Sequence, residues 1–232
     1  MAVRFDGKIC LVTGAAGNLG RAVAQAFAAE GASLILMDHA EEQLRSAYGT
    51  EGSGRRFALA DLRDAQSVAR AIPAGTRIDI LCNIAGGFRM GQPVHETSDE
   101  TWDLMLGLNA RSVLNCARAV VPGMLAAGGG KIINVGAIAA LSGKANMSAY
   151  IASKSAVIRL TESMAAELRE KGINVNCVLP STIDTPQNRK DMPKADPKRW
   201  VAPEALADVV LFLASDAARA IHGASIPVAG LA

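Results

Sequence analysis

Seven short apolar runs alternate with segments of helical period along nearly the whole chain, and this alternation limits the fold most strongly. Continuous apolar runs are typical of parallel strands buried on both faces, and helices between them form the crossover connections. The pattern predicts an α/β fold, with a doubly wound, seven-stranded parallel sheet and helices on both faces. Strands are expected at 8–13, 33–37, 56–60, 78–83, 131–135, 173–178 and 224–228, and helices at 18–30, 41–47, 65–71, 99–127, 149–171 and 203–214.

The 232 residues are expected to form one domain, 1–232, because no repeat, low-complexity stretch or linker divides them. Residues 181–201, after the sixth strand, show no clear period and contain Pro186, Pro193 and Pro197. Irregular segments of about twenty residues are uncommon in compact domains and are often functional. We therefore expect a substrate lid at 181–201, and an exposed insertion is the alternative.

The composition argues against several classes of function. The formal net charge is +2 and no long cluster of Lys and Arg occurs, so nothing favours a nucleic-acid partner. No apolar run reaches the roughly 18 residues that span a bilayer, and the first residues lack the apolar core of a secretion signal. A cytoplasmic protein without a membrane partner is expected. Because Cys10, Cys82, Cys116 and Cys177 are far apart, we expect core thiols and no metal site.

A glycine-rich turn joins the first expected strand to the first expected helix. Gly14, Gly17 and Gly20 allow a tight turn and a close approach of backbone N–H groups to a pyrophosphate, which then faces the helix N-terminus. Asn18 and Leu19 lie between the last two glycines. This placement between strand and helix predicts a dinucleotide-binding site of the Rossmann type.

Acidic residues at two strand ends bear on the cofactor. Asp38 ends the second strand, where a carboxylate accepts hydrogen bonds from the adenine ribose and repels a 2′-phosphate. NAD(H) is therefore expected rather than NADP(H). Asp61 and Leu62 end the third strand and are expected to border the adenine, although Asp61 could equally cap the next helix.

Tyr150 and Lys154 stand four positions apart in an expected helix, so they lie on one face. An ammonium beside a phenol favours the ionised phenol and lowers its pKa. We therefore expect Tyr150 to donate or accept a proton near neutral pH.

These motifs resemble the short-chain dehydrogenase/reductase family over essentially the full length of the chain. The resemblance implies an NAD(H)-dependent oxidoreductase of a small-molecule substrate, assembled as a homodimer or homotetramer. It implies that Tyr150 transfers the proton, that Lys154 controls the pKa of Tyr150 and binds the nicotinamide ribose, and that Asn109 holds a water of the proton relay. It also implies that the adenosine side of the cofactor cleft is formed by Asn83, Ala85 and Gly86, and that the nicotinamide side is contacted by Pro180, Ile183 and Thr185.

The chain departs from the family at the position of its usual serine, which is Ala137. In a ketone reductase that hydroxyl donates to the substrate oxygen, and removal of such a donor typically costs on the order of 10²–10³ in rate. An acceptor that is already polarised needs the donor less. Ser142 and Ser148 lie nearby and are alternatives for the missing group, although neither has the usual offset.

A narrower resemblance, strongest in the C-terminal half, is to dihydropteridine reductase, which also lacks the serine. It rests on residues 136–141, 179–190 and 192–196 together with Trp200. It favours hydride transfer to a small polarised acceptor such as a dihydropterin. Two alternatives stay open: an alcohol/ketone or 3-oxoacyl reductase that tolerates Ala137, and a sensor that binds NAD(H) without turnover.

Overall fold

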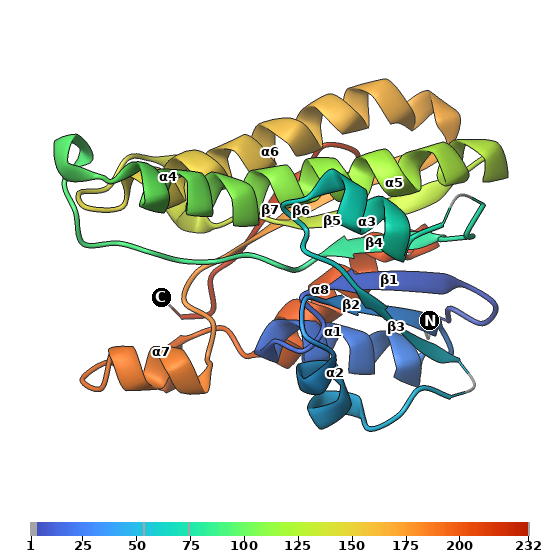
Figure 1. The fold of residues 1–232 in the computed structure, drawn as a ribbon, viewed down its shortest axis with the longest axis horizontal. Coiled ribbons are helices and arrows are strands. Elements are labelled where there is room, and N and C mark those ends of the chain that lie inside the picture. The colour runs from blue at the N-terminus through green and yellow to red at the C-terminus, as the bar shows by residue number, and fades with distance from the viewer. Residues whose placement is uncertain (1–3, 53, 74, 232) are drawn as a thin grey trace.

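The computed structural model describes residues 4–52, 54–73 and 75–231, which form one sheet with helices on both faces (Figure 1). The strands are β1 (Ile9–Thr13), β2 (Ser33–Asp38), β3 (Arg55–Leu59), β4 (Ile80–Asn83), β5 (Gly130–Val135), β6 (Ile173–Pro180) and β7 (Ser225–Val228). The helices are α1 (Asn18–Ala29), α2 (Glu41–Tyr48), α3 (Ala65–Ala71), α4 (Asp99–Leu106), α5 (Ser112–Ala127), α6 (Ser148–Leu168), α7 (Pro186–Asp191) and α8 (Pro203–Ala214).

The strand order is β3-β2-β1-β4-β5-β6-β7, and every neighbouring pair is parallel. The order reverses between β1 and β4, and open α/β sheets bind ligands at the carboxyl ends of the strands at such a point. The predicted seven-stranded, doubly wound sheet is confirmed, and each predicted strand lies within three residues of an observed one.

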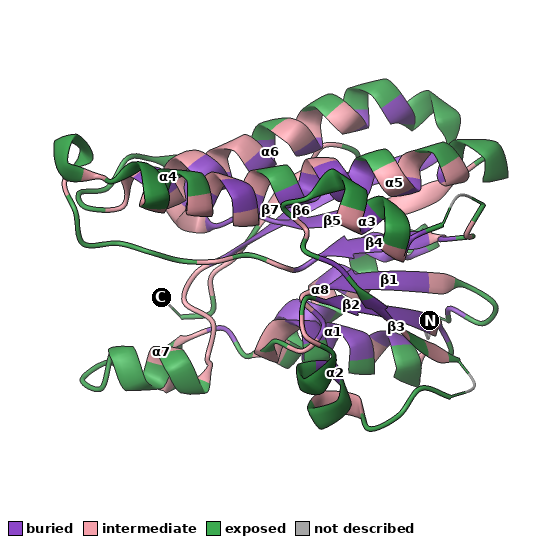
Figure 2. Cartoon of the chain, viewed as in Figure 1, coloured by how far each residue is buried: buried purple, intermediate pink, exposed green. Residues whose placement is uncertain are grey.

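The helices cover the sheet in two layers, with α1, α2 and α8 on one face and α3, α4, α5 and α6 on the other (Figure 1). On the first face, Val23 and Phe27 of α1 pack with Val210 of α8 against the strands. On the second face, Val68 of α3 and Val120 of α5 occupy a separate cluster. The inner strands β1, β2, β4, β5 and β6 are largely buried between these two cores, which explains their mainly apolar sequences, whereas the edge strands β3 and β7 are only partly buried (Figure 2).

The predicted helix at 99–127 is interrupted. Helix α4 ends at Leu106, residues Gly107–Arg111 form one π-helical turn, and α5 begins at Ser112. A π-turn inserts a residue into the helical ladder and often occurs at functional sites. Here it carries Asn109, which is buried.

The expected lid at 181–201 is not irregular throughout, and this part of the prediction is wrong. It contains α7, where Pro186 occupies the first turn and the hydroxyl oxygen of Thr185 accepts a hydrogen bond from the Asn188 backbone N–H at 3.1 Å. The base of the segment is fixed by a parallel bridge between Ile183 and Val201. Helix α7 has no buried residue and projects away from the sheet (Figures 1 and 2). Its role as a substrate lid stays a prediction.

No helix among the described residues is both long enough and apolar enough to cross a membrane. The same residues contain no cluster of His, Cys, Asp and Glu that could hold a metal ion. As predicted, all four cysteines are buried free thiols, three in strands and one in α5.

Candidate active site

The glycine-rich turn after β1 has the geometry that a pyrophosphate requires. Gly14 has a φ of +62°, and a Cβ there would lie 2.8 Å from the Ala85 Cα, so only glycine fits. A Cβ on Gly20 would collide with the Gly14 carbonyl oxygen. Gly17 precedes α1 as its N-cap and supplies no side-chain cap, which leaves the first-turn N–H groups without a side-chain acceptor among the described residues. These residues fit a bound dinucleotide phosphate.

The other residues of the turn support α1. The Asn18 amide oxygen accepts a hydrogen bond from Arg21 at 3.0 Å on the exposed side. Leu19 packs against the core on the first face of the sheet. Neither side chain blocks the N-terminus of α1.

Asp38 is buried at the carboxyl end of β2, beside the glycine turn. Its Oδ2 accepts a hydrogen bond from the Ala16 N–H at 3.0 Å. Its Oδ1 lies 2.8 Å from both the backbone N and the Nδ1 of His39. Asp38 therefore holds the turn in place and still has lone pairs for a ribose hydroxyl.

Asp61 and Leu62 follow β3 at the same edge. Asp61 forms an exposed ion pair with Arg63 at 2.8 Å, which lowers the pKa of the Asp61 carboxyl. It does not cap α3, because Asp64 accepts the capping hydrogen bond from the Gln66 N–H at 2.9 Å. The Leu62 carbonyl accepts a hydrogen bond from Asn115 at 2.9 Å, and contact of either residue with an adenine stays a prediction.

Tyr150 and Lys154 lie in the first two turns of α6, as predicted. Lys154 is only 5% exposed, and its Nζ donates a hydrogen bond to the Val135 carbonyl oxygen at the end of β5 at 2.8 Å. Burial lowers the pKa of Lys154 to about 8, because the ammonium loses its hydration.

The predicted lowering of the Tyr150 pKa is wrong for this structure. Burial raises the pKa of Tyr150 to about 12, since a phenolate is poorly solvated there. The Lys154 ammonium is hydrogen-bonded to Val135 and does not offset this effect. At neutral pH Tyr150 therefore carries its proton.

Asn109 connects the π-turn to both the β4 loop and α6. Its Oδ1 accepts from the Gly87 N–H at 2.9 Å, and its Nδ2 donates to the Gly87 carbonyl at 3.1 Å. The same Nδ2 lies 2.9 Å from the hydroxyl of Ser153, which donates to the Tyr150 carbonyl. A Cβ on Gly86 would lie 2.7 Å from the Asn109 Oδ1 and 3.1 Å from the Lys154 Nζ, so the three residues are in close contact.

The start of the β4 loop is tied to β1 and β5. The Asn83 side chain donates to Asn134 on β5 at 2.8 Å, and the Ala85 N–H donates to the Thr13 hydroxyl at 3.1 Å. Ala85 also touches Gly14 of the glycine turn. The glycine turn, the start of the β4 loop and Lys154 therefore adjoin one another at the carboxyl ends of the strands.

Ala137 is buried in extended backbone after β5 and offers no side-chain donor. Ser148 does not replace the missing hydroxyl freely, because its Oγ is hydrogen-bonded to the Thr97 Oγ1 at 3.1 Å. Ser142 is exposed at the end of the short 3₁₀ turn Ile138–Leu141.

Phe88 packs against Tyr150, with ring centroids 4.8 Å apart and an interplanar angle of 83°. Although it is a large apolar side chain, Phe88 is 54% exposed. Its loop is fastened on both sides, by the Asn109 contacts at Gly87 and by a 2.9 Å hydrogen bond from the Gly91 N–H to the Asn146 carbonyl. The ring is therefore held at the surface beside Tyr150.

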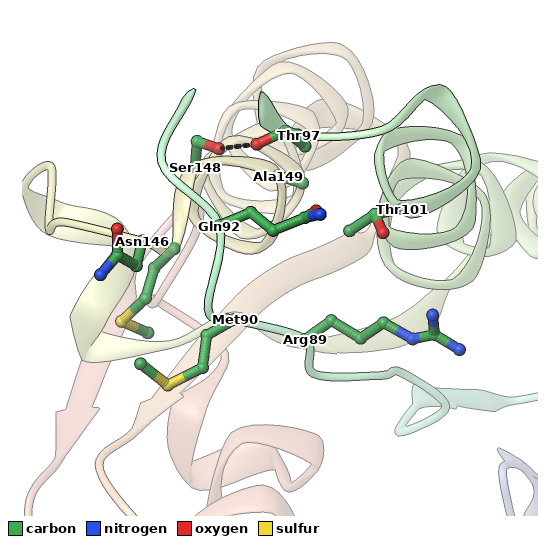
Figure 3. Close-up of a pocket in the computed structure, with 9 residues that line it drawn as sticks. Arg89, Met90, Gln92, Thr97, Thr101, Asn146, Ser148 and Ala149 are labelled. Carbon is green, nitrogen blue, oxygen red and sulfur yellow. Dashed lines mark hydrogen bonds between the residues drawn. The ribbon is translucent and has the colours of Figure 1, made fainter. Parts of the chain in front are cut away.

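A pocket of about 230 Å³ lies between this loop and the N-terminus of α6. Figure 3 shows Gln92 and Thr101 pointing toward one another across it, with the Thr97–Ser148 hydrogen bond at one side. Among the described residues that line the pocket, Arg89 is the charged one.

Residues after β6 form the opposite side of the edge. Pro180 ends the buried strand, and the hydroxyl of the next residue, Ser181, donates to the Ala229 carbonyl at 2.7 Å. The Ile183 carbonyl accepts from the Asn188 side chain at 2.8 Å, and Thr185 caps α7. Ile183 and Thr185 are therefore well anchored, and their contact with a cofactor stays a prediction.

Comparisons with known proteins agree with this geometry. Residues 8–196 match the family model of the short chain dehydrogenase. The D-threitol dehydrogenase of Mycolicibacterium smegmatis is 37% identical, over 98% of this chain and 93% of its own length. The 3-oxoacyl-[acyl-carrier-protein] reductase of Thermotoga maritima is 36% identical, over 98% of each chain. A gluconate 5-dehydrogenase from Burkholderia cenocepacia, solved with NADP and tartrate, has a TM-score of 0.89 at 30% identity and covers 98% of this chain and 95% of that one.

The chain belongs to the short-chain dehydrogenase/reductase family. It is an oxidoreductase that uses a nicotinamide cofactor, as its relatives named dehydrogenases and reductases indicate.

Sequence reasoning missed several contacts that shape the site. No sequence motif indicates the hydrogen bonds that Ser153 and Gly87 form with Asn109. Tyr48, whose hydroxyl reaches the glycine turn, is separated from it by 33 residues. The contact of Phe88 with Tyr150 depends on the conformation of the loop after β4, which no local sequence signal specifies.

Proposed function

We propose that this protein is an NADH-dependent reductase of a small, planar acceptor that is already polarised, of the dihydropterin class. Tyr150 would donate the proton. The bound nicotinamide would supply the hydride, which adds to the conjugated ring while the proton goes to a ring nitrogen.

The absence of a donor at Ala137 carries this proposal. A ketone develops full negative charge on its oxygen as hydride arrives. A hydroxyl donor stabilises that charge, and its loss typically lowers the rate by a factor on the order of 10²–10³. A conjugated ring that accepts hydride spreads the charge over its nitrogens and needs no such donor. The buried methyl of Ala137 is therefore compatible with the second kind of acceptor.

The state of Tyr150 supports the reductive direction. Because burial raises its pKa to about 12, Tyr150 holds a proton at neutral pH and can act as an acid. Lys154, with a pKa near 8, is largely protonated at pH 7 and can bind a ribose hydroxyl and support proton return to Tyr150.

The exposed ring of Phe88 supports a planar substrate. Aromatic rings gain free energy from stacked or edge-on contacts with other rings, about 0.5–1.5 kcal/mol beyond the area that they bury. Phe88 is held beside Tyr150 with more than half of its surface exposed. It can orient a flat acceptor against the tyrosine without a hydrogen bond from position 137.

NAD(H) is proposed over NADP(H) because of Asp38. Its carboxylate lies at the carboxyl end of β2, where it would repel a 2′-phosphate. His39, the next residue, is hydrogen-bonded to that carboxylate. The preference is read from KM values for NADH and NADPH with one acceptor, and a lower KM for NADPH would contradict it.

The test of the proposal is NADH oxidation by the purified protein. Quinonoid dihydropterin, generated in situ, is compared with simple ketones and 3-oxoacyl thioesters at equal concentration. The proposal expects kcat/KM for the pterin to exceed that for every ketone. A ketone or thioester that is reduced faster would contradict it.

An alcohol/ketone or 3-oxoacyl reductase is the second candidate, favoured by the names of the two curated relatives. It requires another donor in place of Ala137, and Ser142 is the nearby hydroxyl without a side-chain partner among the described residues. Loss of ketone turnover in Ser142→Ala would support this candidate. A sensor without turnover is disfavoured by membership of an oxidoreductase family.

We further infer a homodimer or homotetramer. Trp102 on α4 and Leu125 on α5 are 42% and 43% exposed on the outer layer of helices, where a second copy could cover them. Sedimentation of the purified protein tests this directly. The cytoplasmic location stays a prediction.

A further inference from the structure

One peptide unit of the glycine turn is held from both sides by side chains of the β2–α2 region. The Tyr48 hydroxyl donates a hydrogen bond to the Ala15 carbonyl at 2.7 Å. The N–H of the same peptide unit, on Ala16, donates to the Asp38 Oδ2 at 3.0 Å. The preceding N–H, on Ala15, donates to the Met37 carbonyl at 3.1 Å. Three consecutive polar groups of the turn are thus fastened to β2 and α2.

This fastening matters because Ala15 is fully buried. A buried carbonyl without a donor is costly, so the Tyr48 hydroxyl fixes the orientation of the peptide rather than merely filling space. Gly17, the N-cap, and Asn18, the first residue of α1, follow directly, and the first-turn N–H groups of α1 have no side-chain cap among the described residues. A rotation of the Ala15–Ala16 peptide would therefore shift the groups that face the pyrophosphate.

Tyr48 is itself held in place. It ends α2 and packs against the core on the first face of the sheet. The Arg55 guanidinium lies 5.8 Å from the centroid of its ring. Burial raises the pKa of Tyr48 to about 12, so its hydroxyl keeps the proton that it donates over the working pH range.

We propose that Tyr48 is a positioning residue for cofactor binding and that Asp38 has a second role as its counterpart on the same peptide. The hydroxyl of Tyr48 reaches the turn only through the backbone carbonyl of Ala15, so Tyr48 sets the affinity for the dinucleotide and not the choice between NADH and NADPH. Asp38 would affect both the affinity and the choice of cofactor, since its Oδ2 holds the Ala16 N–H and its carboxylate would accept a hydrogen bond from the adenine ribose. The inference rests on the proposed NAD(H) site at this turn.

The test replaces Tyr48 with phenylalanine, which keeps the ring and removes the hydroxyl. NADH and NADPH are titrated separately by fluorescence, without any acceptor. The dissociation constants for both cofactors are expected to rise by the same factor, about 3- to 10-fold, with kcat changed less than KM. Ser46→Ala, an exposed substitution on the same helix, is the matched control and should leave both constants unchanged.

Hydrogen exchange gives a readout that is independent of the cofactor. The Ala16 amide hydrogen of the unliganded protein should exchange faster in Tyr48→Phe than in the wild type. The losses of NADH binding free energy caused by Tyr48→Phe and Asp38→Ala should not add up in the double variant, because both side chains hold one peptide unit. Strict additivity, or an unchanged Kd and exchange rate in Tyr48→Phe, would overturn the inference.

The outcomes separate this inference from the proposed function. If the wild type binds NADH and Tyr48→Phe binds it equally well, the positioning role alone is wrong. If Tyr48→Phe weakens only one of the two cofactors, Tyr48 acts at the ribose and the positioning role is again wrong. If the wild type does not bind either cofactor, the proposed site at the turn fails and the inference falls with it.

Discussion

Replacing Lys154 with methionine is expected to make the protein without cofactor more stable at pH 7, although it removes a candidate catalytic group. Methionine has nearly the length of lysine and carries no charge, so it can occupy the same buried path along α6. The wild-type ammonium is 5% exposed, and no carboxylate accounts for its pKa. Its one hydrogen bond within the described residues is to the Val135 carbonyl.

The magnitude follows from the pKa of Lys154, which burial lowers from 10.5 to about 8. The difference of about 2.5, at about 1.4 kcal/mol per pKa unit, means that burying the charge destabilises the fold by about 3.5 kcal/mol at neutral pH. Methionine leaves the Val135 carbonyl without its donor, which costs about 1 kcal/mol. The variant should therefore gain about 2.5 kcal/mol in free energy of unfolding.

The sign of the pH dependence distinguishes this explanation from simple packing. Below about pH 8 Lys154 is protonated in both the folded and the unfolded state, so the full destabilisation is present. Between about pH 8 and 10.5 the unfolded chain binds a proton that the folded protein has released, so wild-type stability from this group rises with pH. The advantage of the variant should shrink over that range.

The assay is urea unfolding of both proteins, without cofactor, at pH 7 and pH 9.5. The titrations of the buried cysteines are common to both proteins and largely cancel in the difference. A variant that is less stable than the wild type at pH 7 would refute the reasoning. A stability difference that is the same at both pH values would refute it as well.

Two further predictions concern the reacting groups. Tyr150→Phe should lower kcat by roughly 10²-fold or more, since it removes the proton donor, while the Kd for NADH changes less than about twofold; near-normal turnover would remove Tyr150 from the mechanism. Phe88→Ala should raise KM for a planar acceptor about 3- to 10-fold through loss of ring contact, and Val94→Ala, on the same loop and 75% exposed, is the control. Equal KM values in Phe88→Ala and Val94→Ala would mean that the ring does not contact the substrate.

The strands and most helices could be predicted because their sequences carry the pattern of burial directly. Runs such as residues 9–12 and 34–37 are apolar throughout since both faces of the sheet are covered. The ranges of α3 and α8 were predicted correctly, and Pro203 in the first turn of α8 is a local signal of where that helix begins. Local signals of this kind need no knowledge of the rest of the fold.

The π-turn and α7 could not be predicted in the same way. The 3.6-residue period continues through Asn109, and the extra residue is accommodated by its bonds to Gly87 and Ser153, which come from distant segments. Helix α7 is short and has no buried residue, so its sequence carries no apolar stripe. Its signals were Thr185 and Pro186, a capping residue followed by a first-turn proline, which the three prolines of the segment obscured.

The electrostatics of the candidate site also depended on the tertiary structure. The spacing of Tyr150 and Lys154 correctly predicted one helix face, but the pKa of the tyrosine depends on how deeply it is buried. The packing of α6 on β5 determines that the Lys154 ammonium donates its hydrogen bond to the Val135 carbonyl. Neither quantity can be read from the order of the residues.

The proposed function depends most on the match between Ala137 and the acceptor, and Ala137→Ser tests that match directly. Turnover with NADH is measured for dihydropterin and for a simple ketone, in the wild type and in the variant. Ala137→Ser is expected to raise the rate of ketone reduction by roughly 10²-fold and to change the rate of pterin reduction less than about twofold. A rise of tenfold or more with the pterin, or a wild type that already prefers the ketone, would contradict it.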